Sequence, residues 1–326
     1  MRIMKGIVIL GQTSTGKSDF AVQIAKLVGG LPAQAGEIIS ADSRQVYKGM
    51  NLGTGKITKK EMLGVPHYLL DVVSPKQIFT VSDFQKLANE KIKEILKRGK
   101  IPIICGGTGF YIDAIVNGTI FPEVPANKKL RAMLEKKTTE ELFETLKKLD
   151  SNRAKTIDKH NKVRLVRAIE IVKALGQVPS ISHRSDLCTS TGLTYASIQY
   201  IKIGLTMPKE ILMEKVRIRL LARIKQGMFR EIKKLHDSGV SWKRLENFGL
   251  EYRYGSRYLK YEATQPSLKL RRAKKEEMIE QLNTKIWQFA KRQKTWFQRD
   301  KSIIWINPLK KSEKTMAIKK VKEFLE

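Results

Sequence analysis

A complete GxxxxGKS motif, with the sequence GQTSTGKS, spans residues 11–18. The glycines of such a loop let consecutive backbone N–H groups point at a phosphate, the lysine adds a positive charge, and the serine hydroxyl can bind Mg²⁺. Such loops are typical of nucleotide-binding proteins, ATP-binding ones among them, so the motif does not select a reaction. It predicts a diphosphate cradle formed by Gly11, Thr13, Ser14, Thr15, Gly16, Lys17 and Ser18, with Ser18 as the Mg²⁺ ligand.

A second candidate for chemistry is Asp42, in the segment SADSRQVYKGM that starts at Ser40. It follows a short apolar run, and ligands of open α/β sheets sit at the carboxyl ends of strands, so Asp42 should face the same crevice as Lys17. A carboxylate there can bind Mg²⁺ or accept the proton of an amine that is being alkylated. It can also simply cap a turn. Thr108, in the glycine-rich turn GGTG, is expected to point into the same crevice.

Short apolar runs that alternate with helical periodicity must position these residues. Helices are predicted at 17–28, 81–98 and 108–116, the second with a capping box at Ser82 and Gln85. The predicted strands are 6–10, 37–40, 67–72, 101–105, 198–205 and 303–306. The expected fold class is α/β: a mostly parallel, P-loop NTPase-like sheet with flanking helices and a helical insertion domain.

The texture of the sequence changes after Gly118, where prolines are followed by leucines at helical spacing and by a long predicted helix at 162–175. We therefore predict a first part of the core at 1–118, a helical insertion at 119–197 and a second part of the core at 198–326. An amphipathic stripe runs through residues 279–296, and Phe289 and Trp296 on it are expected in the core.

The chain has 326 residues and a formal net charge of +31, and residues 200–326 alone carry 32 basic and 14 acidic side chains. Such an excess indicates either a polyanionic partner such as nucleic acid or a solvated lysine-rich surface. Two cysteines provide no disulfide framework, and the apolar runs are far shorter than the roughly 20 residues that span a bilayer. We expect a cytoplasmic protein that does not enter membranes.

Six motifs occur in an order that resembles one family, the tRNA dimethylallyltransferases, also called tRNA isopentenyltransferases. They are GQTSTGKS (11–18), SADSRQVYKGMNLGTGK (40–56), PHYLLDV (66–72), GGTGFYIDAIVNG (106–118), NKVRLVRAIEI (161–171) and KRQKTWF (291–297). The resemblance implies transfer of a dimethylallyl group from dimethylallyl diphosphate to N6 of the adenosine 3′ of the anticodon, position 37, in tRNAs that read codons starting with U. It also implies release of diphosphate and a requirement for Mg²⁺.

The resemblance implies residue roles as well. Asp42 matches the general base, while Arg219 and Ser18 match catalytic positions near the diphosphate, with Arg217 and Arg223 close enough to take the place of Arg219. The implied tRNA contacts are Asp42, Ser43, Arg44, Gln45, Thr108, Arg131, Val163, Arg164, Leu165, Val166, Arg167, Tyr252 and Arg253. Two positions depart from the family pattern, since Gln12 replaces a usual proline and Glu251 a usual glycine. We expect a monomer with no stable protein partner.

Three other functions fit some of the same residues. A P-loop kinase would use the phosphate loop and Asp42, but the basic C-terminal third would have no role. An RNA-binding NTPase switch needs a metal-binding Asp at a strand end, for which Asp71 is the candidate, although a structural role suits it better. A transferase of free adenine nucleotides would not need a large basic surface. The four histidines are scattered, so we expect no metal cluster.

Overall fold

The computed structural model describes residues 4–28, 35–119, 121–179 and 198–326. The chain forms two compact units, one made of Met1–Val116 with Leu193–Glu326 and the other of Asn117–Gly192. The C-terminal end of the predicted insertion, 119–197, lies outside the described residues. Cys188 and His183 also lie outside them. Among the described helices, none is long and apolar enough to cross a membrane.

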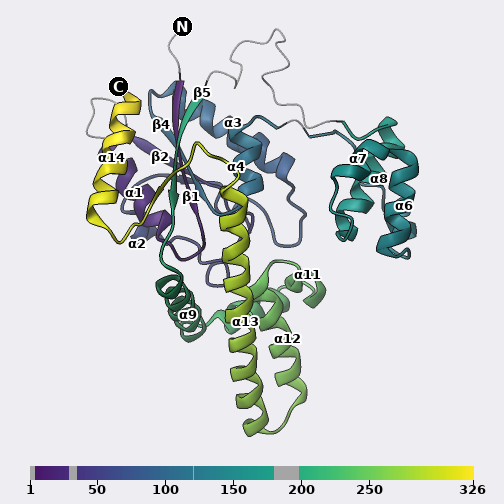
Figure 1. Ribbon diagram of the computed structural model, residues 1–326. Helices are drawn as coiled ribbons and strands as arrows, with labels where there is room; N and C mark the ends of the chain where they lie inside the picture. Colours follow the sequence, from purple (N-terminus) through teal and green to yellow (C-terminus); the bar gives the residue numbers. More distant parts are fainter. Residues whose placement is uncertain (1–3, 29–34, 120, 180–197) are drawn as a thin grey trace. The chain divides into compact units, whose positions relative to one another are not determined.

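The first unit is built on a six-stranded sheet with the order β3-β2-β4-β1-β5-β6, in which every described pair of strands is parallel (Figure 1). This confirms the predicted fold class, and the carboxyl ends of the strands share one edge. The strands are β1 (Met4–Gly11), β2 (Gly36–Ser40), β3 (His67–Tyr68), β4 (Ile101–Gly106), β5 (Ile198–Leu205) and β6 (Ile304–Ile306).

Helices cover both faces of this sheet, which explains why its strands are continuous apolar runs rather than alternating ones. Ile7 and Ile9 of β1 pack with α1 (Lys17–Val28) and α14 (Lys311–Leu325). Val8 and Leu10 point the other way, toward α3 (Val81–Lys97) and α4 (Gly109–Val116). The segment Met4–Gly11 is therefore a strand that is buried over its last six residues.

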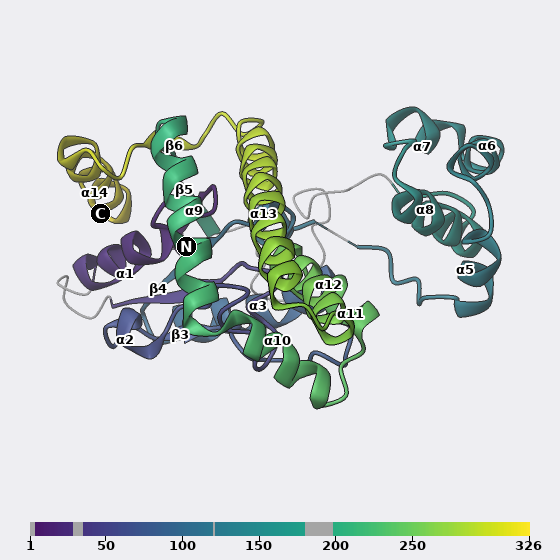
Figure 2. The ribbon, with the colours of Figure 1, turned by 90° about the horizontal axis from the view of Figure 1, so that it is seen from below.

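A group of helices continues the first unit beyond the carboxyl edge of the sheet. The 30-residue helix α13 lies beside α12 in both views of the ribbon and packs on it through Met278, Leu282 and Ile286 (Figures 1 and 2). Its last residue, Phe297, joins the core on one sheet face. The helices of this group are α9 (Lys209–Gln226), α10 (Met228–Asp237), α11 (Trp242–Glu246), α12 (Leu250–Thr264) and α13 (Leu268–Phe297), and the short α2 (Lys59–Met62) precedes β3.

The second unit is helical in its described part, with a core that includes Leu142, Leu146, Leu165 and Ile169. Its helices are α5 (Lys128–Leu134), α6 (Thr139–Leu149), α7 (Ser151–Thr156) and α8 (Lys162–Leu175). The helix predicted at 162–175 is thus confirmed to the residue.

Two local predictions are wrong. The strand predicted at 67–72 ends at Tyr68, because Leu69 and Asp71 have φ values of 61° and 55°, which a strand does not accommodate. The capping box of α3 uses Thr80 and Asp83 instead of Ser82 and Gln85. The Thr80 hydroxyl accepts from Asp83 N at 3.2 Å, and the Asp83 carboxylate accepts from Thr80 N at 2.8 Å.

The contact of α3 with α4 gives a test of this packing. Phe84 is fully buried and stacks on Tyr111, with ring centroids 3.9 Å apart. Phe84→Ala should lower the free energy of unfolding by about 3 to 5 kcal/mol, because it leaves a cavity in the core. Phe110→Ala is the matched control, since Phe110 is 45% exposed. Equal losses in urea denaturation of the two variants would contradict the assigned core.

Candidate active site

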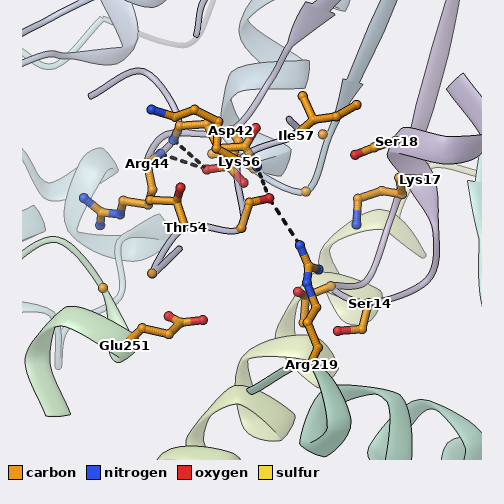
Figure 3. A pocket seen from close by; sticks show the side chains of 18 of the residues that line it. Ser14, Lys17, Ser18, Asp42, Arg44, Thr54, Lys56, Ile57, Arg219 and Glu251 are labelled. Carbon is orange, nitrogen blue, oxygen red and sulfur yellow. Dashed lines mark hydrogen bonds between the residues drawn. The ribbon is translucent and has the colours of Figure 1, made fainter. Parts of the chain in front are cut away.

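A pocket of about 1050 Å³ lies at the carboxyl edge of the sheet, entirely within the first unit. The loops after β1, β2 and β4 line it from one side, and residues of α9, α12 and α13 line it from the other. Figure 3 shows Lys17, Asp42, Arg219 and Glu251 around the same space. The structure thus brings together the phosphate motif and Asp42, as the order of the strands requires.

The phosphate loop turns sharply between β1 and α1. Ser14 and Gly16 have φ values of 63° and 82°, in the left-handed region, so the chain reverses direction and exposes its backbone amides. The Thr15 hydroxyl donates to the Gln12 carbonyl at 2.8 Å from inside the loop. The loop residues on the pocket wall are Thr13, Ser14, Gly16, Lys17 and Ser18.

Two of the predicted cradle residues present no side chain to the pocket, and the phosphate contact of their backbone N–H groups stays a prediction. Thr15 is fully buried and does not line the pocket. Gly11 closes β1, where an added Cβ atom would overlap the backbone of Leu205. Both residues shape the loop from behind, and their side-chain positions do not face a ligand.

Lys17 lines the pocket, is half-buried and donates to the Gln12 carbonyl at 2.5 Å. Burial lowers the pKa of its ammonium group from 10.5 to about 8, and the positive charge of Arg219 acts in the same direction. The carboxylate of Asp42 opposes this shift. A half-buried cation without a full counter-charge is a strong attractor for a phosphate group.

Asp42 follows β2 and shapes its own turn. Its Oδ1 accepts from the backbone N–H of Arg44 at 2.8 Å and, more weakly, from that of Gln45 at 3.4 Å. These two contacts use one carboxylate oxygen. Asp42 therefore fills the turn-capping role that the sequence left open, and it also lines the pocket.

The structure separates the three candidate arginines of α9. Arg217 pairs with Glu280 at 2.8 Å and is not among the lining residues. Arg219 and Arg223 line the pocket, and the Arg219 guanidinium donates to the Gly55 carbonyl at 3.3 Å. Burial, reinforced by Arg223, lowers the pKa of Arg219 to about 10. Arg219 therefore faces the phosphate loop, as the resemblance implies.

Two polar side chains that the sequence analysis missed, Gln293 and Glu231, hold these loops in place. Gln293 is buried and Glu231 is half-buried. The Gln293 side chain accepts from Thr13 N at 2.8 Å and donates to the Gly107 carbonyl at 2.8 Å, so it ties the phosphate loop to the loop after β4. Next to it, the Gln12 amide donates to the Ala290 carbonyl of α13 at 3.2 Å. One signal existed, because Gln293 is a polar residue on the buried stripe that includes Leu282 and Phe297.

The second missed residue is Glu231 of α10. It accepts from the backbone N–H groups of Asn51, Leu52 and Gly53 at 2.7 to 3.0 Å and fixes the start of the loop that carries Gly55. It also accepts from the Tyr252 hydroxyl at 2.7 Å. Tyr252 is among the residues that line the pocket although it is only 1% exposed, and its contact with RNA stays a prediction. No feature of the sequence distinguishes Glu231 from the other acidic residues of the basic third.

The remaining predicted contacts around Asp42 are close together. Ser43 N donates to the Thr108 hydroxyl at 3.1 Å, so the loops after β2 and β4 are joined there. Gln45 donates to the Gly55 carbonyl at 3.3 Å. Arg44 and Arg253 also line the pocket. The Ser43–Gln45 segment is therefore part of the same site as Asp42.

Aromatic side chains of α13 behave differently from the expectation of core packing. Phe289 is 40% exposed and lines the pocket, so placing it in the core was wrong. Trp296 is half-buried: its ring packs on the sheet core, and its indole N–H donates to Asp113 at 2.9 Å. The Arg292 guanidinium lies 6.0 Å from the Phe289 ring centroid. An exposed ring beside a cation is suited to stacking on a base.

The predicted RNA contacts in the second unit fall into two groups. Val163, 79% exposed, and Arg164 lie on the surface of that unit. Arg131 and Arg167 both bond to the buried carboxylate of Glu170, at 2.7 and 2.5 Å. Leu165 and Val166 need a correction, because their side chains are buried in the core of the unit and cannot face RNA.

Asp71, the residue considered for an NTPase switch, pairs with Lys56 at 2.5 Å and does not line the pocket. Among the residues that the structure describes, no group of three or more His, Cys, Asp or Glu side chains could hold a metal ion. An ion here would depend on ligands from the substrate.

Comparison with known proteins gives consistent matches. The model of the family described as IPP transferase matches residues 45–300. The chain is 42% identical to "tRNA dimethylallyltransferase 2" of Treponema denticola over 302 residues, which cover 92% of this chain and 94% of that protein. It is 36% identical to "tRNA dimethylallyltransferase" of Anoxybacillus flavithermus, with 93% and 90% covered.

Solved structures give the same result. The full-length tRNA isopentenylpyrophosphate transferase of Bacillus halodurans superposes with a TM-score of 0.69 and 30% identity, and the match covers 99% of this chain and 97% of that one. A eukaryotic dimethylallyltransferase acting on tRNA superposes with a TM-score of 0.75 and 25% identity, covering 99% and 79%.

The lowered pKa of Lys17 predicts how diphosphate binding depends on pH. Lys17 is charged below about pH 8 and neutral above it, and a bound diphosphate favours the charged form. Affinity for inorganic diphosphate should therefore fall as pH rises through 8, and binding at about pH 8.5 should take up protons. Calorimetry in two buffers of different ionisation enthalpy measures this uptake. Lys17→Arg is the control, because a guanidinium stays charged throughout this pH range, and an uptake of the same size in that variant would refute the assignment.

Gln293 provides a test of the tie between the loops. In Gln293→Leu, Thr13 N and the Gly107 carbonyl lose a buried partner, so we expect diphosphate binding to weaken roughly tenfold. Gln281→Leu on the same helix is the matched control, because the Gln281 amide is exposed and bonds to Glu277 one turn away. If Gln293→Leu bound diphosphate as tightly as the control does, the two hydrogen bonds of Gln293 would not contribute to diphosphate binding.

Proposed function

The chain belongs to the IPP transferase family, and on that basis we propose that it transfers a dimethylallyl group from dimethylallyl diphosphate to N6 of an adenosine in tRNA. One observation carries the proposal: Lys17 and Arg219, two half-buried cations, line the same pocket as the carboxylate of Asp42. That combination serves a reaction in which an anion leaves and an amine loses a proton.

The leaving group sets the main catalytic demand. When the bond between the allylic carbon and oxygen breaks, negative charge develops on the diphosphate and positive charge on the allylic carbon. Lys17, Arg219 and the backbone N–H groups of the phosphate loop are preorganised to stabilise the diphosphate charge. Because these groups are partly buried, they interact with that charge more strongly than they would in water.

Asp42 is assigned the role of general base. The exocyclic amine of adenine attacks the allylic carbon, and the proton that it must lose is taken by the carboxylate. The turn formed with Arg44 N holds the Asp42 side chain in place. Thr108 and Ser43, joined at 3.1 Å, place a second polar wall beside it.

Mg²⁺ is part of the proposal. The Ser18 hydroxyl lines the pocket beside Lys17, and Mg²⁺ is commonly held by one or two protein oxygens together with substrate phosphates and water. Ser18 therefore fits the role of the protein ligand of Mg²⁺. The bound ion would neutralise more of the negative charge of the diphosphate.

The RNA partner explains the basic surface. An adenine inside a stacked loop cannot present its amine to Asp42, so the base must leave the stack, and loop nucleotides do this at low cost. Phe289, exposed beside Arg292, is suited to hold a base by stacking. We place the target at the adenosine 3′ of the anticodon, position 37, in tRNAs that read codons starting with U, and propose a cytoplasmic monomer.

The decisive experiment incubates the chain with Mg²⁺, labelled dimethylallyl diphosphate and unmodified tRNA that carries adenosine 3′ of the anticodon. Label at N6 of that adenosine is expected. A parallel reaction replaces the prenyl donor with ATP. Phosphate transfer from ATP to a small acceptor, without prenyl transfer, would replace the proposal with a kinase, and label on free adenine nucleotides would reassign the acceptor.

Asp42→Asn separates the base from the turn, because the amide oxygen can still accept from Arg44 N. We expect the single-turnover rate to fall by roughly a hundredfold or more, as loss of a general base does. tRNA affinity, measured by filter binding, should change little. Asp237→Asn, in an exposed pair with Lys233, is the control. A single-turnover rate equal to that of the wild type would remove the base role.

A further inference from the structure

Besides Asp42, the acidic residues that line the pocket are Asp19, Glu61 and Glu251, and the proposed reaction uses none of these three. Glu251, in the first turn of α12, lines the pocket opposite the phosphate loop (Figure 3). Its Oε1 lies 3.2 Å from the Arg223 guanidinium, and the two side chains are only 20% and 11% exposed. An acidic side chain buried in a pocket built to attract an anion works against that attraction and therefore calls for an explanation.

The partner of Glu251, Arg223, lies next to Arg219, the proposed diphosphate ligand. Arg219 and Arg223 are four residues apart on α9, so they lie on the same face of the helix. Both guanidinium groups pack against Gly55, where an added Cβ atom would overlap them. Two like charges so close together in a buried site repel each other, and the repulsion lowers the pKa of Arg219.

The two arginines differ in their partners. Arg219 donates to a backbone carbonyl, that of Gly55, and the carboxylates of Glu251 and Asp42 act on its charge without a direct hydrogen bond. Arg223 is paired with a full negative charge. A guanidinium that is paired with a carboxylate attracts a diphosphate far less than an unpaired guanidinium does, because the carboxylate repels the same ligand.

From these contacts we infer that Glu251 sets the affinity of the site for diphosphate by keeping Arg223 engaged, so that Arg219 alone of the two arginines serves the ligand. This inference rests on the proposed function. Glu251 then has a positioning role that affects product release, because inorganic diphosphate is a product that must leave the site after each turnover. A site with two free arginines would retain it and slow turnover, as product release often does.

The test measures the dissociation constant of inorganic diphosphate by calorimetry with Mg²⁺ at pH 7. Glu251→Gln removes the charge and should tighten binding roughly five- to thirtyfold, the usual range of a coupling between two sites. The steady-state turnover rate should fall while the single-turnover rate stays close to that of the wild type. Glu251→Asp keeps the charge and should keep the wild-type affinity.

A double-mutant cycle identifies Arg223 as the agent. In the Glu251→Gln background, Arg223→Gln should abolish the gain, so that the double variant binds diphosphate about as tightly as the wild type does. Glu246→Gln is the charge-matched control, since Glu246 pairs with Arg257 and Lys260 and does not line the pocket. If the gain of Glu251→Gln persisted in the double variant, the inference would be overturned, because Arg223 would then not be the group that binds the diphosphate more tightly.

Failure of the inference differs from failure of the proposed function. If the wild type binds diphosphate and Lys17→Met does not, while Glu251→Gln binds no more tightly than the wild type, the phosphate site stands and the role of Glu251 is refuted. If the wild type does not bind diphosphate at all, both the proposed function and the role of Glu251 are overturned. Thermal denaturation of Glu251→Gln and Glu251→Asp shows whether both variants are folded when they are compared.

Discussion

The arrangement of the whole pocket depends on two half-buried cations, Lys17 and Arg219. Burial lowers the pKa of Lys17 to about 8 and that of Arg219 to about 10, because charges removed from water need other dipoles around them. The chain supplies backbone carbonyls, the Gln12 oxygen for Lys17 and the Gly55 oxygen for Arg219. Both carbonyls belong to glycine-containing loops. These loops therefore provide carbonyl groups that bind the two cations, and the cations in turn lie where the proposed phosphate would bind.

The loops are held in turn by helices from the far end of the chain. Gln293 of α13 bonds to the loops after β1 and β4, and Glu231 of α10 bonds to the loop that carries Gly55. Each is a buried or half-buried polar group whose partners in these loops are backbone atoms, so the loop backbone is held at more than one point. The phosphate site consequently depends on the folding of the C-terminal helices, although its motif lies within the first 18 residues.

Sequence reasoning succeeded where the determinants are local. Strand β5 and helices α1 and α8 follow from runs of apolar residues and their spacing, and the phosphate loop follows from its glycines and Lys17. It failed where partners are distant. Gln293 contacts Thr13 across 280 residues, and Glu231 contacts Leu52 across 179, so no local pattern announces either contact. The exposure of Phe289 was missed for the same reason, because its stripe position says nothing about the pocket beside it.

The order of the strands also explains how one pocket accommodates both halves of the proposed reaction. Asp42 follows β2 and the phosphate loop follows β1, with β4 between them. Neighbouring strands lie about 4.8 Å apart, so the two loops start about 10 Å from each other, which leaves room for a five-carbon group between a diphosphate and an amine. The loop after β4 must not fill that space. A Cβ atom added at Gly106 or Gly107 would overlap the Ala41 carbonyl or the Gln293 amide, so glycine at both positions keeps the base and the phosphate cradle in register.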